Sequence, residues 1–129
     1  MADHYFFLIE RLIMSATFTW KLDWMKASTQ TINGFSEVVL ECGWRCIGTE
    51  TVNGTTYTND IYNTCTFPEP AEGASFTPVN ELSTAQVIGW CWSNGVNQEA
   101  TEAAINANLA AQITPATVQP PLPWAIPAA

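Results

Sequence analysis

The stretch Thr49–Thr58, with the sequence TETVNGTTYT, carries the strongest local structural signal in the chain. Both central residues of a type I′ turn need a positive φ, and the pair Asn53-Gly54 tolerates that conformation best. Polar and apolar residues alternate in the run that leads into this pair, which is typical of a half-buried strand. The stretch therefore predicts a β-hairpin with a two-residue loop.

A two-residue loop also fixes how the two strands of the hairpin pair, because Val52 must then face Thr55. Continued without a bulge, the pairing gives three further pairs: Cys46 with Ile61, Trp44 with Asn63, and Cys42 with Cys65. The last pair falls at a hydrogen-bonded position, where Cα atoms lie about 5.5 Å apart, within the range of a disulfide. We favour thiols, because a bulge at Gly43 or Gly48 would shift the register, and the disulfide stays open.

The rest of the chain extends the hairpin into a small α+β fold. Apolar residues between Phe18 and Trp24 alternate with polar ones, which predicts a strand before the hairpin. A proline-rich connector, PEPAEGASFTP, follows the hairpin and leads into two helical segments. Strands followed by helices are typical of an α+β domain with the helices packed on one sheet face. The expected elements are three antiparallel strands at about 16–26, 35–52 and 55–67, and helices at about 84–94 and 98–113.

The ends of both helices carry recognisable signals. Ser83 is placed to cap the first helix, with Gln86 reaching back to complete a capping box. Gly95 is the expected glycine after that helix, and Asn97 the cap of the next. The second helix has a narrow apolar stripe flanked by alanines, which suggests close approach to another element. This stripe consists of Ile105, Leu109 and Ile113.

Tryptophans mark the expected core. Trp20, Trp24 and Trp44 all fall on the inferred inner face of the sheet, where packing is favoured over a sugar-stacking platform. Trp90 and Trp92 are two residues apart, about 200° around a helix, so they cannot share one face. One of them is expected to face outward or toward a partner, and we name Trp90 as the interaction candidate.

The length and net charge of the chain limit the classes of partner that it can bind. The chain has 129 residues, a formal charge of −8 and only four Lys and Arg residues. Its length suits a single domain, which we place at residues 14–114. Nucleic-acid binding requires several cations to displace phosphate counterions, and the same negative field disfavours an anionic membrane surface. No apolar run approaches the roughly 18 residues of a membrane span. We therefore expect neither nucleic acid nor membrane as a partner.

The first thirteen residues, MADHYFFLIERLI, do not match a signal peptide. Their apolar run, Tyr5–Ile9, is shorter than a signal-peptide core and is closed by Glu10 and Arg11. Met14 then opens the segment MSATFTW. Our hypothesis is that translation begins at Met14 and that residues 1–13 are an upstream extension.

The four cysteines do not form a recognisable metal site. Cys42 and Cys46 lie in CGWRC, which we interpret as strand, so about 13 Å separates them. Sulfur ligands of one tetrahedral zinc lie about 4 Å apart, given Zn–S distances near 2.3 Å. We expect Cys42, Cys46, Cys65 and Cys91 to be buried free thiols.

Catalytic motifs are absent from the sequence. His4 is the only histidine and lies in the predicted extension, so histidine-based triads and general bases are missing from the body. No phosphate-binding glycine loop, serine-hydrolase elbow or nicotinamide fingerprint occurs. Glu41 and Asp60 fall on the polar sheet face, where a glycosidase-like carboxylate pair stays open. We expect no enzyme activity, no metal and no cofactor.

Residues 115–129 form an uncharged, proline-rich arm. Its prolines hold the backbone near polyproline II and lower the entropy lost on docking. The sequence PPLP also fits a proline-rich ligand for aromatic grooves. We expect the arm to dock on its own sheet or on a neighbouring subunit, in preference to a disordered tail. The residues expected to make this contact are Pro120, Pro121, Leu122, Pro123 and Trp124.

Two sequence motifs resemble those of a known family. FTPVNELSTAQVIGW at Phe76–Trp90 and PPLPW at Pro120–Trp124 resemble a family of small uncharacterised proteins encoded by tailed bacteriophages, especially those of marine and cyanobacterial hosts. The resemblance covers about residues 15–124. It brings no catalytic residues and implies a phage gene product, such as a virion accessory protein.

The favoured function is a virion structural or accessory protein, such as a head decoration, connector or tail component. It would dock on other virion proteins or on copies of itself, since a three-stranded sheet has two open edges to cover; a homo-oligomer therefore stays open. The alternative is a soluble module in the host cytoplasm that binds a host protein. A carbohydrate-binding module is the third interpretation.

Overall fold

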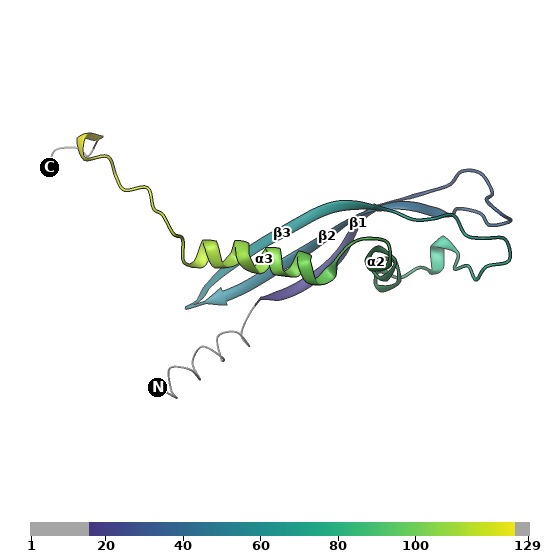
Figure 1. The fold of residues 1–129 in the computed structure, drawn as a ribbon, viewed down its shortest axis with the longest axis horizontal. Helices are drawn as coiled ribbons and strands as arrows, with labels where there is room; N and C mark the ends of the chain where they lie inside the picture. The colour runs from purple at the N-terminus through teal and green to yellow at the C-terminus, as the bar shows by residue number, and fades with distance from the viewer. Residues whose placement is uncertain (1–15, 126–129) are drawn as a thin grey trace, which may run out of the picture.

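The computed structural model describes residues 16–125 and has the α+β architecture that the sequence predicts. Its sheet is antiparallel with the order β1-β2-β3, and two helices follow it. A proline-rich arm leaves the end of the second helix and runs away from the body (Figure 1). The elements are β1 (Thr17–Ala27), β2 (Val39–Val52), β3 (Thr55–Thr66), η1 (Val79–Glu81), α2 (Thr84–Ser93), α3 (Gln98–Ile113) and η2 (Pro123–Ala125).

Some sequence-based hypotheses concern segments beyond these bounds. The proposed extension at residues 1–13, the proposed start at Met14 and the single histidine, His4, lie outside the described residues. The same is true of residues 126–129 at the end of the arm. Within residues 16–125, no helix combines the length and the apolar character needed to cross a membrane.

The β2–β3 hairpin has the predicted turn and the predicted register. Asn53 and Gly54 have φ values of 51° and 81°, as a type I′ loop requires. Val52 pairs with Thr55, and the pairing runs without a shift as far as Glu41 with Thr66. The three further predicted pairs are confirmed: Cys46 with Ile61, Trp44 with Asn63, and Cys42 with Cys65.

The pairing of β1 with β2 is less regular, and this corrects one prediction. The register shifts between Leu22 and Trp24, so the residue between them has no partner on β2. Trp24 consequently pairs with Gly43, and its indole lies over that glycine on the face away from the helices. Its Nε1 donates to the Tyr62 hydroxyl at 2.8 Å. The expectation that Trp24 belongs to the inner face was therefore wrong, whereas Trp20 packs against the core cluster as expected.

The second strand also begins later than predicted, at Val39 instead of residue 35. Ile32 and Phe35 close a separate tight turn through a β-bridge around Asn33-Gly34, both of which have positive φ. Glu37 then has a φ of 51°, which interrupts the extended backbone before β2. The other predicted boundaries agree with the observed ones to within one residue.

Both helices begin where their capping residues indicate, and α2 ends where Gly95 indicates. Ser83 Oγ accepts from the amide of Gln86, and Asn97 Oδ1 accepts from the amide of Ala100. Gly95 has a φ of 102°, and the amide after it bonds back to the Cys91 carbonyl at 3.0 Å, a Schellman arrangement. The reciprocal half of the predicted capping box is absent, because the Gln86 side chain donates to Thr77 Oγ1 instead.

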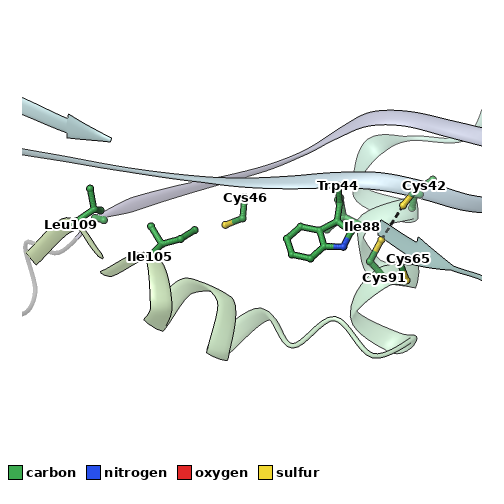
Figure 2. Close-up of a cluster of buried hydrophobic side chains, with 10 residues drawn as sticks. Cys42, Trp44, Cys46, Cys65, Ile88, Cys91, Ile105 and Leu109 are labelled. Carbon is green, nitrogen blue, oxygen red and sulfur yellow. Dashed lines mark hydrogen bonds between the residues drawn. The ribbon is translucent and has the colours of Figure 1, made fainter. Parts of the chain in front are cut away.

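The core lies between the helices and one face of the sheet (Figure 2). Ile105 and Leu109 of α3 are fully buried, and Ile113 is half-buried, so the predicted stripe faces the sheet. The close approach occurs at Gly48 of β2, where an added Cβ would overlap Ile105 Cγ2. A glycine in mid-strand therefore lets α3 settle directly on the backbone of β2.

Side chains from α3 and β3 occupy part of the outer edge of β3. In an antiparallel pair every second residue points its backbone polar groups away from the neighbouring strand. Counting from the turn, Thr58 and Thr64 are such residues of β3. Gln112 Nε2 donates to the Thr58 carbonyl at 3.2 Å, and the Thr64 amide donates to Asn63 Oδ1 at 2.8 Å. Both edge groups are thus already bonded.

Candidate docking surfaces

The arm holds five of the six predicted interaction residues, and it presents them to solvent. The chain leaves α3 at Thr114 and ends its described part in the short 3-10 helix at Pro123–Ala125. Trp124 is 81% exposed, Leu122 is 53% exposed and Val118 is 84% exposed. Within the described residues the arm does not lie on the sheet of its own chain (Figure 1). Of the two docking modes that the sequence left open, the one on the chain's own sheet is not seen among the described residues.

The sixth predicted residue, Trp90, lies at the other end of the molecule, in α2. It is half-buried and packs edge-on against Phe67, with ring centroids 5.6 Å apart. Trp92, at 38% exposure, is the more solvent-exposed of the pair and packs edge-on against Trp20. The structure therefore separates Trp90 from the arm and makes Trp92 the residue that faces outward.

Trp90 forms part of an apolar groove that the sequence analysis did not identify. The groove has a volume of about 350 Å³ and lies between α2, the start of β2 and the connector after β3. Its aromatic and aliphatic walls come mainly from Phe67, Phe76, Leu82 and Trp90. Glu37 is the one charged residue among those that line it. Phe76, Leu82 and Trp90 all belong to the motif Phe76–Trp90. This motif was the one feature of the sequence that could have indicated the groove.

Two side-chain contacts hold the groove walls in place. Phe76 stacks on Phe35, with centroids 4.5 Å apart and planes 20° from parallel. Gln86 Nε2 donates to Thr77 Oγ1 at 3.1 Å, which ties α2 to the connector. The groove is thus formed before any ligand binds.

Three of the four cysteines lie together where α2 packs on the sheet: Cys91 comes from α2, Cys42 from β2 and Cys65 from β3 (Figure 2). Cys42 Sγ lies 3.4 Å from Cys91 Sγ, and Cys65 Sγ lies 3.7 Å from the Asn94 carbonyl. All four cysteines are buried and free, as the sequence predicts. Within residues 16–125, no group of three or more histidine, cysteine or acidic side chains is arranged to hold a metal ion.

Burial should make these thiols unreactive. It raises the pKa of Cys42, Cys65 and Cys91, and it raises the pKa of Cys46 to about 11. Because the thiolate is the nucleophile, we expect iodoacetamide at pH 8 to leave all four cysteines of the native chain unmodified. The intact mass should show four additions after unfolding in urea. Rapid modification of any cysteine in the native chain would contradict this expectation.

The face of the sheet away from the helices carries charged side chains, and it separates the two carboxylates that the sequence left open as a pair. Arg45 bonds both Asp23 and Asp60, and its guanidinium holds the pKa of the Asp23 carboxyl below its usual value. Glu41 forms an ion pair with Lys26 instead. Asp60 pairs with Ile47, six strand positions from Glu41, or about 20 Å. Glycosidase carboxyl groups lie about 5–10 Å apart, so these two cannot act as such a pair.

A family described as a domain of unknown function (DUF7936) matches residues 15–124, and the chain therefore belongs to this family. No curated protein and no solved structure matches the chain.

Proposed function

We propose that this member of the DUF7936 family is a non-catalytic docking protein, and that it serves as a structural or accessory component of a phage particle. The observation that carries the proposal is the exposure of Trp124 on a proline-stiffened arm that stands off the body. Trp124 and Leu122, two residues before it, both expose apolar surface to water, and tryptophan is enriched among residues that dominate interface energies. The phage assignment rests on the resemblance of the motifs at Phe76–Trp90 and Pro120–Trp124.

The shape of the arm suits docking. Pro120, Pro121 and Pro123 restrict the backbone, so little conformational entropy remains to be lost when the arm binds. No charged side chain follows Glu102, so the arm itself brings no ionised side chain that would have to be desolvated.

The proposal predicts that Trp124→Ala removes the protein from particles. Truncating an interface tryptophan typically costs 2 kcal/mol or more, about a 30-fold loss of affinity. Quantitative mass spectrometry of purified particles should show the variant at a small fraction of the unmodified level. Val118→Ala is the matched control, because Val118 is equally exposed on the same arm but lies outside the PPLPW motif.

Two results would count against this proposal. Absence of the unmodified protein from purified particles would exclude a structural role there. Arm-dependent capture of a host protein, tested with and without residues 115–129, would then favour the alternative of a host-directed module. Equal retention of both variants would instead remove Trp124 from the contact.

A further inference from the structure

We infer that the groove lined by Phe67, Phe76 and Trp90 receives the arm of a second copy of this chain, with Pro120–Trp124 as the bound segment. The inference rests on the proposed docking function and names the partner. It joins two features that lie at opposite ends of the molecule (Figure 1). The groove is an open pocket with apolar walls, and the arm exposes the apolar side chains of Leu122 and Trp124.

The chemistry of the two surfaces is complementary. Proline-rich segments bind in grooves lined by aromatic side chains, where the preformed polyproline II backbone loses little entropy. Three aromatic residues line the groove, and its volume of about 350 Å³ is in the range of ligand-binding pockets. The stacking of Phe76 on Phe35 and the bond from Gln86 to Thr77 fix the walls, so the groove needs little ordering when it binds.

Charge favours the arm as the part that meets another copy. The described residues carry ten carboxylates and three cations, and Arg45 is committed to Asp23 and Asp60. Two such acidic bodies repel each other on approach. Residues 114–125 carry no charge, so they can enter the groove without that repulsion, and the groove itself adds only Glu37.

Chain length makes docking on the same molecule unfavourable. The ten residues after Thr114 span about 31 Å as polyproline II. Returning along α3, which has 16 residues, would use about 24 Å of that reach before the arm came near α2. A neighbouring copy placed end to end avoids this return path. The contact is then head-to-tail, with different surfaces on the two sides, and it can continue into a ring or a filament.

Two variants test the two sides of this contact, the arm and the groove, independently. Trp124→Ala removes the anchor of the arm but leaves the groove intact. Ser75→Glu puts a charge into the groove at an exposed position, so the fold should not be disturbed. Ala107→Glu, on the exposed side of α3, adds the same charge elsewhere and is the matched control.

The experiment measures the mass of the full-length chain by analytical ultracentrifugation into the millimolar range. The unmodified chain and Ala107→Glu should associate beyond a dimer as concentration rises, and each of the two test variants alone should stay monomeric. A one-to-one mixture of the test variants should form dimers and nothing larger, because it has one competent arm and one competent groove per pair. That pattern of complementation is specific to an arm-in-groove contact.

Three outcomes would overturn the inference. They are an unmodified chain that stays monomeric, a mixture that stays monomeric although the unmodified chain associates, and an Ala107→Glu variant that behaves like Ser75→Glu. A monomeric chain whose incorporation into particles still depends on Trp124 would reject self-docking and leave the proposed function standing. Loss of both would reject the two together.

Discussion

Replacing Trp44 with alanine is expected to lower the free energy of unfolding by about 3–5 kcal/mol, the largest effect of any single change considered for this molecule. Trp44 is 4% exposed at the centre of β2, and its ring lies 5.2 Å from that of Trp20. Truncation would remove this aromatic contact and leave a cavity between the sheet and the helices. Urea unfolding followed by far-UV circular dichroism measures the change.

Trp24→Ala is the matched control for Trp44→Ala. Both residues are tryptophans in neighbouring strands, but Trp24 lies on the open face and bonds the half-exposed Tyr62. Its truncation should cost about 1 kcal/mol, because little cavity is formed at a solvated surface. Equal losses from the two variants would show that Trp24 is packed inside the core after all.

Replacing Gly48 with alanine is expected to destabilise the fold by about 1–3 kcal/mol through overpacking. The added methyl group would overlap Ile105 Cγ2 and lie 3.2 Å from Phe18 Cε1, so α3 would have to move off the sheet. Ile105→Ala creates room at that point. The double variant should therefore be more stable than the sum of the two single losses predicts, which a double-mutant cycle measures.

Gly89→Ala is the control for replacing a glycine by alanine where no neighbouring atom is in the way. Gly89 lies within α2, where an added Cβ would meet no atom within 4 Å. Alanine is favoured over glycine in a helix, so this variant should gain about 0.5–1 kcal/mol. Additive losses in the cycle between Gly48 and Ile105 would contradict a direct clash between them.

The predictable part of the fold is the part that local chemistry dictates. A two-residue loop at Asn53-Gly54 leaves one register for the hairpin, and that register placed Cys42 opposite Cys65 correctly. The helix caps at Ser83 and Asn97 were also predictable from the sequence, because each bonds a backbone amide within four residues of its own position.

The parts that the sequence did not reveal depend on residues far apart in the chain. The alternation from Phe18 to Trp24 continues unbroken through the register shift, so nothing local marks the point at which Trp24 changes face. The groove could not be predicted for the same reason: Phe67 and Trp90 are 23 positions apart in the chain and come into contact only after α2 packs on the sheet. Trp90 was therefore predicted as an interaction residue, but the groove that it lines was not predicted.

The hydrogen bond from the Gln112 side chain to the Thr58 carbonyl occupies an edge group of the sheet that a foreign strand would need. A foreign strand that tried to extend the sheet beside β3 would first have to displace that side chain and free the Thr64 amide from Asn63. On the opposite side, β1 is interrupted after Leu22 and carries Lys21 and Lys26, devices that discourage amyloid-like stacking. Extension of the sheet by a further strand is thus hindered at both edges, so a contact between copies has to be made by side chains or by the arm and not by backbone pairing.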